Sequence, residues 1–535
     1  MPKWQAEQRE LSLNEACTRW LHVVEKAATQ AVPTKGVSGG AKPWWSPRLE
    51  KLAKRKDGLR RRYQETGNEE LKKQYREAQN EFDRVSDEQK EKTWRKKCEE
   101  MDSEELATNE LMRLYRRTHD KQSKKPITLS HNGTEAVTTK EKVELLGDFY
   151  SKVGKNTGES YGEIRRWQDQ VEREFEEEHM ETERSAVEEF QSMISKEEVQ
   201  WVVKQLVARK APGPDGVAPP LVIQGGEVMI ESLLTLYRRT WAEGHLPPQW
   251  KEANICPIPK VTAASTCGKF RPISLLSVVS KLMERIVARR LYRYVERENV
   301  LPEYQSGFRQ GHSTVNLLAE LQQEAHSAFA RRESLLFVML DIEKAYDRAW
   351  RPGIMRRLRD IGVDGRMLVW IRDFLGERRA RVVLDGQKSE WRPSEYGVPQ
   401  GSPLSPLLFN IFVAPVLRRV KTGKLMFADD IGLFLRGKNM RALSRRMTRE
   451  LAWVSLWAHK WKAKFNLGKC IALALSRNRP TPIPSVRFDG KTLKVPRTDA
   501  DLVEHAKYLG VVLDCVASAL TYNQEEGNEA APFPT

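Results

Sequence analysis

The sequence predicts an α+β fold that is preceded by a long helical extension. From residue 195 to about 515 the chain alternates helical stretches with short runs of β-forming residues, two of which form a hairpin around a tight turn. Before them, residues 48–120 are rich in Lys, Arg, Glu and Gln, with apolar residues at helical spacing. A chain of 535 residues is too long for one ordinary domain, so we expect two to four lobes.

The first 130 residues predict a linker and a basic helical extension. Val32–Pro47 holds Gly, Pro and Ser around Trp44 and Trp45, which is typical of a linker. The apolar residues that follow it are spaced three to four apart or at multiples of that spacing, which predicts one or two long amphipathic helices. These helices could be a solvated hairpin or a basic arm that follows nucleic acid, and the sequence leaves both interpretations open.

Residues 131–200 are acidic and separate the extension from the rest of the chain. Within them, residues 160–200 are helix-prone but carry few apolar anchors, so we expect a solvated helix or a flexible joint. The ordered core is predicted to begin near Ser195, whose hydroxyl starts a capping box with Glu198. The main domain is therefore expected at 201–515, and residues 516–535 lose all periodicity and are expected to be disordered.

The charge of the chain points to a polyanionic partner. The formal net charge is +17, and residues 201–535 hold 52 Lys and Arg against 33 Asp and Glu. Six scattered cysteines without a CxxC pair predict neither a disulfide framework nor a zinc site. The first ten residues are not a secretory signal, and the apolar stretch at 404–417 is too short and too interrupted by proline to cross a bilayer. We expect a soluble intracellular protein, nuclear or cytoplasmic, that does not bind membranes.

Three aspartates are candidates for a metal site. Leu335–Leu340 is an unbroken apolar run of strand length that ends at Asp341. A carboxylate at the end of a buried strand is costly unless it is paired or binds a metal. Some 90 residues later, Asp429 and Asp430 occupy a tight turn between two short strands. If that hairpin lies beside the first strand, the three carboxylates can hold two Mg²⁺ ions about 3.5–4 Å apart.

The chain resembles the reverse transcriptases of non-LTR (LINE-type) retrotransposons in nine motifs that follow one another in the order of that family. The resemblance implies a right-hand polymerase fold with fingers and palm, and an RNA-directed DNA polymerase that adds dNTPs to a primer 3′-hydroxyl. It implies an RNA template, a DNA primer and Mg²⁺, or Mn²⁺, as partners. The motifs are RKAPGPDGV (209–217), PIPK (257–260), FRPISLLSVVSKLMERIV (270–287), YQSGFRQGHST (304–314), LDIEKAYD (340–347), YGVPQGSPLSPLLFNIF (396–412), FADD (427–430), FNLGKC (465–470) and YLGVVLD (508–514).

The resemblance implies roles for the three aspartates and for Tyr346. It implies that Asp341 and Asp429 bind the catalytic metals, with Asp430 beside them. Tyr346 matches the steric gate that excludes a ribonucleotide 2′-hydroxyl, and the alternative is a packed aromatic at the strand-to-helix turn. Asp347, next to it, is expected to be a structural hydrogen-bonding residue.

The nucleotide-binding residues follow from the same resemblance. Gln400 and Gly401 match a turn that contacts the incoming nucleotide, where glycine allows close backbone approach and a helix start favours negative charge. Arg271 and Lys260 match the fingers residues that bind the triphosphate, and a surface role is the alternative for each. Lys469 resembles a lysine that protonates the pyrophosphate leaving group.

Two further segments are expected near the primer–template duplex. Tyr508, Leu509 and Gly510 resemble the primer grip, where glycine permits close approach to the primer backbone. The Pro/Gly-rich loop at 211–216 precedes the fingers in the family and lies near the template, and a purely structural turn is an equal alternative.

The chain also departs from the family pattern. Nothing in it resembles the endonuclease domain that usually comes first, and only 21 residues follow Asp514, where the family continues into a helical thumb. We therefore expect a retroelement piece, truncated at both ends, with intact catalytic residues and weak stand-alone activity. The alternative is a catalytically inactive nucleic-acid-binding remnant. Protein partners and oligomeric state are not predicted.

Overall fold

The computed structural model describes most of the chain. The described residues are 11–31, 44–66, 68–99, 128–155, 162–177, 185–261, 264–476, 483–495, 498–499, 502–503, 506–513 and 521–522. Within these ranges, no helix combines the length and the apolar composition that crossing a bilayer requires.

The sheet that carries the aspartates has four antiparallel strands in the order β11–β5–β10–β9. One face of β5 packs Leu335, Phe337 and Met339 into a cluster with α13, and the other face faces the main core. This confirms the prediction of a strand that is buried on both sides. The bounds are β5 (Ser334–Asp341), β9 (Gly423–Phe427), β10 (Asp430–Gly437), β11 (Ile471–Leu475) and α13 (Thr314–Ala330).

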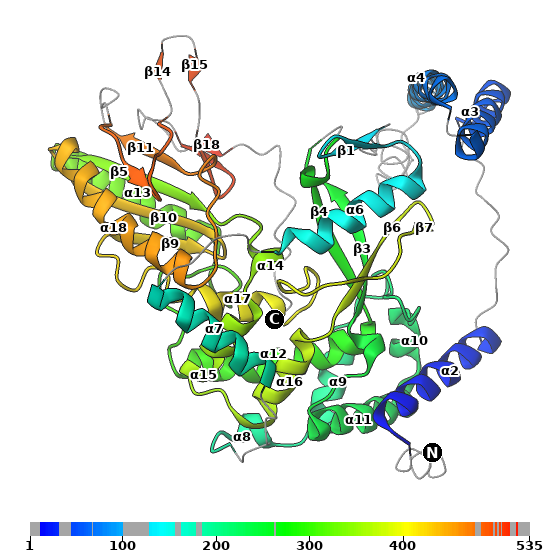
Figure 1. The fold of residues 1–535 in the computed structure, drawn as a ribbon, viewed down its shortest axis with the longest axis horizontal. Helices are drawn as coiled ribbons and strands as arrows, with labels where there is room; N and C mark the ends of the chain where they lie inside the picture. The colour runs from blue at the N-terminus through cyan, green and yellow to red at the C-terminus, as the bar shows by residue number, and fades with distance from the viewer. Residues whose placement is uncertain are drawn as a thin grey trace.

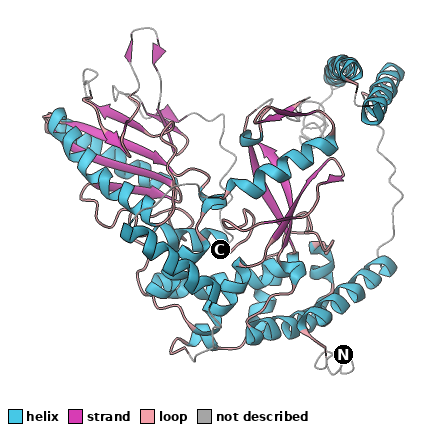
Figure 2. Ribbon diagram, viewed as in Figure 1, coloured by secondary structure: helices cyan, strands magenta, loops and turns pink. Residues whose placement is uncertain are grey.

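A second sheet lies on the other side of the molecule, and Figures 1 and 2 show the two sheets well apart above a layer of helices. In it, β3 pairs with β4 antiparallel and with β6 parallel. Helix α6, which begins with a complete capping box of Thr138 and Glu141, packs against β6, β7 and β8. The bounds are β3 (Glu252–Pro259), β4 (Phe270–Leu276), β6 (Arg379–Leu384), β7 (Gln387–Lys388), β8 (Arg392–Pro393) and α6 (Thr139–Val153).

The helices between and below the sheets bury the main core. Their apolar faces meet around Trp241, Trp250 and Trp370, which are almost completely buried. Ser195 caps α9 through Glu198 as the sequence predicts. The bounds are α8 (Glu188–Gln191), α9 (Lys196–Lys204), α10 (Pro219–Gln224), α11 (Gly226–Glu243), η1 (Pro248–Trp250), η2 (Cys267–Lys269), α12 (Val278–Arg297), α14 (Ala345–Arg348), α15 (Arg351–Asp360), α16 (Gly365–Leu375), α17 (Ser405–Val413) and α18 (Met440–Lys460).

The N-terminal extension contains one docked helix and one helical pair. Trp20 of α2 (Leu13–Ala31) is buried, and its indole N–H donates to Ser232 of α11 at 3.0 Å. Helices α3 (Pro47–Thr66) and α4 (Glu69–Glu99) pack on each other, away from the helical layer (Figure 1). Two long helices are therefore confirmed here, while most of the expected linker and residues 100–127 lie outside the described residues.

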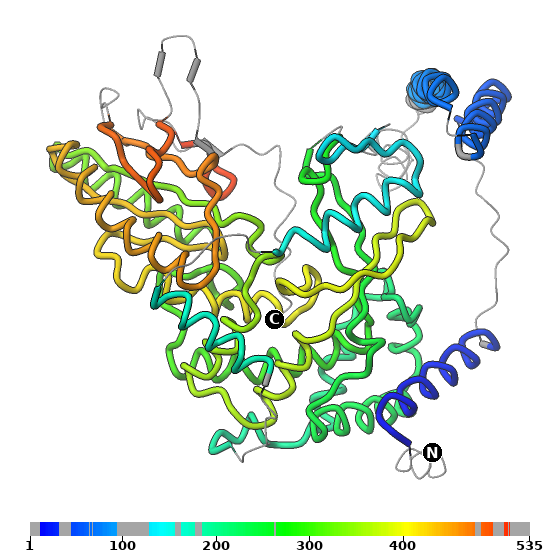
Figure 3. The backbone as a smooth tube through the Cα atoms, viewed as in Figure 1, coloured from blue at the N-terminus to red at the C-terminus, as the bar shows by residue number. Residues whose placement is uncertain are grey.

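The expectation of a solvated or flexible segment at 160–200 is wrong. Helix α7 (Gly162–Glu177) buries Val171 in the main core, and its Gln168 amide donates to the carbonyls of His459 and Lys460. Figure 3 shows α7 crossing α15, and it also contacts α18. Because Trp20 and α7 contribute to the core, the core does not begin near Ser195. Several glutamates of α7 are near its apolar stripe and form polar contacts, Glu172 with Trp350 and Lys462 and Glu174 with Arg356, and their density hides the stripe in the sequence.

The remaining strands are short, and all of them except β1 and β2 lie near the end of the chain. The expected disordered tail after residue 515 lies outside the described residues except for Thr521 and Tyr522, which pair with β17 and complete a three-stranded sheet. That pair is therefore regular structure and not disordered. The bounds are β1 (Leu129–His131), β2 (Thr134–Ala136), β12 (Arg487–Phe488), β13 (Lys491–Thr492), β14 (Thr498–Asp499), β15 (Leu502–Val503), β16 (Ala506–Tyr508), β17 (Val511–Leu513) and β18 (Thr521–Tyr522).

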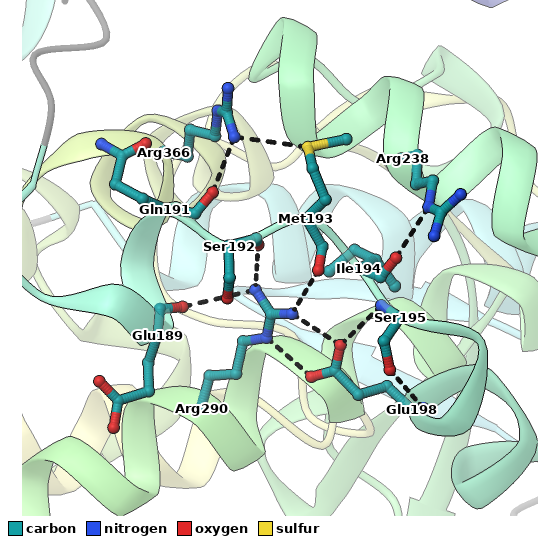
Figure 4. Close-up of polar contacts among 10 residues, drawn as sticks. All are labelled: Glu189, Gln191, Ser192, Met193, Ile194, Ser195, Glu198, Arg238, Arg290 and Arg366. Atoms are coloured by element: carbon teal, nitrogen blue, oxygen red, sulfur yellow. Dashed lines mark hydrogen bonds and ion pairs between the residues drawn. The ribbon is translucent and has the colours of Figure 1, made fainter.

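A buried arginine holds the loop that joins α8 to α9. The guanidinium of Arg290, only 5% exposed, donates to both carboxylate oxygens of Glu198, at 2.7 and 2.6 Å (Figure 4). It also donates to three main-chain carbonyls in α8 and the loop after it, and Arg238 and Arg366 donate to two more. The loop therefore relies on arginines for the carbonyls that no helix or strand satisfies. The five accepting carbonyls are those of Glu189, Gln191, Ser192, Met193 and Ile194.

Replacing Arg290 should destabilise the protein strongly. The Arg290→Met variant leaves the Glu198 carboxylate and several carbonyls without their donor, and the free energy of unfolding should fall by about 3–5 kcal/mol. Urea unfolding followed by circular dichroism measures the change. Arg297→Met is the control, since Arg297 binds Glu189 in an ion pair at the surface and should shift the midpoint far less. Equal shifts for the two variants would show that burial of Arg290 is not the cause.

Candidate active site

The first two aspartates face each other across the central sheet. Asp341 is the last residue of β5, and its pairing partner is Asp430, the first residue of β10. β5 reaches this position because its apolar side chains anchor it on both faces, which leaves only its polar end near the surface. The pairing brings together two carboxylates that lie 89 positions apart in the sequence.

The third aspartate lies in the turn between β9 and β10. Phe427 pairs with Asp430, so the turn consists of Ala428 and Asp429 alone. The sequence placed Asp430 in this turn as well, but the ladder with β5 extends it into the strand. Ala428 has a positive φ of 56°, a left-handed conformation that a residue with a Cβ adopts only at a cost. The tight turn brings the Asp429 carboxylate close to Asp341.

Burial and neighbouring carboxylates raise the pKa values of Asp429 and Asp430. Burial, followed by the charges of Asp429 and Asp341, raises the pKa of Asp430 to about 7. Burial and the charge of Asp341 also raise the pKa of Asp429. The ammonium of Lys469 lies 3.5 Å from a carboxylate oxygen of Asp341 and lowers both values in part. This end of the sheet therefore favours a cation.

The donor set fits a hard divalent metal ion. Carboxylate oxygens are the protein ligands that Mg²⁺ prefers, and Mg²⁺ commonly takes only one or two of them, together with water and substrate oxygens. Over the described residues, no group of three or more His, Cys, Asp or Glu side chains is already arranged around a common metal position. Asp341 and Asp429 are the residues that could hold an ion, with Asp430 next to them.

Tyr346 lies beside these carboxylates in a cluster of aromatic rings. Its ring stacks on Phe409 of α17, with centroids 5.1 Å apart, and meets Phe308 edge-on. Burial and the nearby charge of Asp429 raise the pKa of its hydroxyl. The hydroxyl has no hydrogen-bond partner in the structure. The ring is thus packed and also lies near Asp429, and its role as a steric gate stays a prediction.

Gln400 and Gly401 connect the two sheets. The Gln400 amide donates to Asp347 at 2.8 Å, which matches the structural role expected of Asp347, and burial raises the pKa of that carboxyl to about 6. The Gln400 carbonyl accepts from the N–H of Ser274 on β4 at 2.7 Å. Gly401 has a φ of 137°, and a Cβ there would lie 2.4 Å from the Ser274 carbonyl oxygen. Glycine is needed at this position because the chain touches β4.

The fingers cations gather opposite the aspartates. Lys260 and Arg271 lie at the end of the β3–β4 hairpin, where both side chains are exposed. Partial burial and then the charge of Lys469 lower the pKa of Lys260, and Arg271 adds to the effect. Asp341 also acts on Lys260. Residues from three distant motifs thus form one cationic region beside the carboxylates.

The Tyr508–Gly510 segment is arranged differently from a stacking platform. The Tyr508 ring is buried against Phe337 beneath the central sheet, with centroids 5.1 Å apart. Leu509 and Gly510, with φ of 49° and 85°, form the two-residue turn between β16 and β17. The buried Tyr508 ring therefore supports the turn from beneath, and the primer-grip role of Tyr508, Leu509 and Gly510 stays a prediction. The turn backbone remains available for contact.

Three site-supporting residues were not singled out from the sequence. Gln305 and Asn410 are both completely buried. Gln305 accepts from the N–H of Ala428 in the turn, and Asn410 donates to the carbonyl of Gly307 in the segment beside it. Arg351 donates to the carbonyls of Tyr396 and Gly397 and fixes the loop that leads to Gln400. Gln305 and Asn410 lie inside quoted motifs, but a buried amide cannot be told from an exposed one by its sequence.

Comparison with known proteins gives consistent relatives. Residues 258–513 match the family of reverse transcriptase (RNA-dependent DNA polymerase). The chain is 30% identical over 353 residues to the RNA-directed DNA polymerase from mobile element jockey of Drosophila melanogaster, which covers 64% of this chain and 37% of that protein. It is 31% identical over 331 residues to the probable RNA-directed DNA polymerase from transposon BS of the same species, covering 60% and 36%. A solved structure of apo telomerase from Candida tropicalis has 13% identity and a TM-score of 0.36, over 56% of this chain and 54% of that one.

The antiparallel sheet with the aspartates at one end is the palm of a right-hand polymerase fold. The second sheet, which carries the cations, belongs to the fingers. Residues 258–513 belong to the reverse transcriptase family, and the chain is related over about 60% of its length to the RNA-directed DNA polymerases of non-LTR retrotransposons. The chain spans a little over a third of the length of the two curated relatives named above.

Changing Gly401 should disturb the junction between fingers and palm. In Gly401→Ala the added methyl group meets the Ser274 carbonyl, so we expect a loss of about 3 kcal/mol or more in the free energy of unfolding. Gly386→Ala is the matched control, because Gly386 also has positive φ but open space around it, and it should lose only about 1 kcal/mol. Urea unfolding of both variants measures the difference, and equal losses would contradict the contact with β4.

Proposed function

We propose that this chain is an RNA-directed DNA polymerase that transfers dNTPs to a primer 3′-hydroxyl by two-metal catalysis. The observation that carries the proposal is the pairing of Asp341 with Asp430, with Asp429 in the adjoining turn. Family membership of residues 258–513 supports it. The partners are an RNA template, a DNA primer and dNTPs, and the metal is Mg²⁺, for which Mn²⁺ can substitute.

Asp341 and Asp429 would hold the metal ions, and Asp430 would tune the charge beside them. When bound, the ions activate the primer hydroxyl and neutralise the triphosphate. Lys469 is the proposed proton donor for the pyrophosphate, and its ammonium group already lies at the edge of the carboxylate cluster. The protein itself mainly orients the reactants and supplies charge, as phosphoryl-type transfers require.

The nucleotide would lie between the fingers cations and the aromatic cluster. Lys260 and Arg271 would bind the triphosphate, because their exposed cationic groups lie near the aspartates. Tyr346 would exclude a 2′-hydroxyl by the position of its stacked ring. Gln400, oriented by Asp347, would contact the nucleotide next to the Gly401 turn.

The primer would be held by backbone and not by stacking. The Leu509–Gly510 turn, exposed at Gly510, would offer its amides to the primer phosphates, while the buried Tyr508 anchors the turn. Residues 201–515 would form the catalytic unit. Helices α6 and α7 come before it in the sequence but pack on it, α6 on the fingers sheet and α7 on the main core.

Asp429→Ala tests the proposed function. Loss of a metal-binding carboxylate should reduce Mg²⁺-dependent primer extension on an RNA template at least about 1,000-fold. The control is Asp169→Ala, which removes an exposed aspartate on α7 and should leave extension unchanged. Extension that survives Asp429→Ala would refute the site, and a folded wild type that extends no primer would refute the function.

The basic face of α3 is the surface that we propose for the template or its duplex. Helix α3 carries eight Lys and Arg against three acidic residues, whereas α4 carries nine of each. The exposed cations fall on one side of the helix, opposite Leu49, which is buried against α4. A phosphate backbone offers a regular row of negative charges that matches such a face, although Lys54 and Arg55 already pair with Glu50 and Glu81. These cations are Arg48, Lys51, Lys54, Arg55, Arg61 and Arg62.

Removing this charge should weaken binding in a salt-dependent way. The triple variant Arg48→Gln, Lys51→Gln, Arg62→Gln should lower affinity for an RNA–DNA hybrid and reduce the slope of log K against log salt by up to about 3. Fluorescence anisotropy at several salt concentrations measures both. The control changes Lys73, Arg84 and Lys92 of α4 to Gln, since these exposed cations alternate with acidic residues. The same slope change in both triples would remove the assignment to α3.

A further inference from the structure

The segment Tyr304–Phe308 lies along the outer edge of the central sheet, next to the catalytic hairpin. The N–H of Met426 on β9 donates to the Tyr304 carbonyl at 2.8 Å, and the N–H of Ser306 donates to the Met426 carbonyl at 2.8 Å. Gln305 is thereby bridged in parallel to Met426. The YQSGF sequence thus adds a short strand-like edge to β9.

The side chain of Gln305 reaches from this edge to the turn. It is completely buried, and its carbonyl oxygen Oε1 accepts from the N–H of Ala428 at 3.0 Å and from the N–H of Gly307 at 2.9 Å. Its Nε2 lies 3.5 Å from the Ala428 carbonyl oxygen. The amide of Gln305 therefore contacts both main-chain polar groups of Ala428, the residue that precedes Asp429.

Ala428 needs such a support. Its φ of 56° is left-handed, and a residue with a Cβ keeps that conformation only when its surroundings determine it. The segment beside it has no spare room, because a Cβ on Gly307 would lie 2.2 Å from the Ala428 nitrogen. The buried Asn410 of α17 holds the Gly307 carbonyl at 2.7 Å. Gln305 thus binds the turn directly, and Asn410 of α17 fixes Gly307, which lies against it.

We infer that Gln305 is a positioning residue for the metal site: its amide fixes Ala428 in the left-handed conformation that directs the Asp429 carboxylate toward Asp341. The inference rests on the proposed function for the identity of the ligand, a divalent cation. Supporting residues behind a metal ligand typically change metal affinity by 10–100-fold, because they set its orientation. Without the amide, Ala428 can relax to an ordinary conformation and carry Asp429 away from Asp341.

A merely structural role would have different consequences. The chain offers a matched comparison in Gln168 of α7, which is 3% exposed and donates to two backbone carbonyls on α18. Gln168 and Gln305 are both buried amides that bind main chain, but only Gln305 contacts the catalytic turn. Replacing each by Met keeps the volume and removes the hydrogen bonds.

The experiment titrates the full-length chain with Mn²⁺ in the absence of primer, template and dNTP, and follows free Mn²⁺ by its electron paramagnetic resonance signal. Gln305→Met should bind Mn²⁺ at least about tenfold more weakly than wild type. Gln168→Met should keep wild-type Mn²⁺ affinity, even if its thermal unfolding midpoint falls as far as that of Gln305→Met. Wild-type affinity in folded Gln305→Met, an equal loss in Gln168→Met, or no Mn²⁺ site in wild type would each overturn the inference.

Two further variants keep the test decisive. If Gln305→Met does not fold, Gln305→Asn, which shortens the amide by one methylene, should show the same weakened Mn²⁺ binding. Ala428→Gly added to Gln305→Met should recover part of the affinity, because glycine adopts positive φ freely. No recovery would overturn the claim that Gln305 acts through Ala428. A wild type that binds Mn²⁺ but extends no primer would refute the proposed function and leave the positioning role intact.

Discussion

The burial of β5 on both faces is the constraint on which the rest of the structure depends. A strand packed by α13 on one side and by the main core on the other cannot shift its register without exposing apolar residues. Its polar end is therefore fixed in space, and with it Asp341. Because β10 pairs with β5 along its whole length, the position of Asp430 follows from the same packing. Packing of the hydrophobic core therefore determines where Asp341 and Asp430 lie.

Electrostatics works against this arrangement, and the surrounding residues compensate. Burial, and after it the charge of neighbouring carboxylates, raises the pKa values of Asp429 and Asp430 and so disfavours their charged forms. Lys469 supplies a counter-charge from a different motif, and the backbone of the turn is held by hydrogen bonds from its neighbours. A site that is strained in the absence of cations is well suited to bind them, since binding relieves the repulsion.

Much of this arrangement can be predicted from sequence, for identifiable reasons. The apolar run before Asp341 and the FADD hairpin are local patterns, and the ladder confirms the strands that they predict. The apolar stripe of α7 was missed, since dense glutamates mask Val171. The burial of Tyr508 was missed as well, because the same tyrosine in an exposed turn would read identically. Gly401 was assigned to nucleotide approach, yet its contact with Ser274 already requires glycine. Contacts between distant segments decide these cases, and no single segment reveals them.

The strand order also determines how the chain must be assembled. β5 lies between β10 and β11, and β11 is formed by Ile471–Leu475, more than 100 residues after β5. Until that segment is synthesised, one edge of an almost entirely apolar strand remains open. Open apolar edges pair with other chains and promote aggregation. The short β11 therefore acts as a protective edge for the nascent protein, and completion of the palm sheet is a late, long-range step of folding.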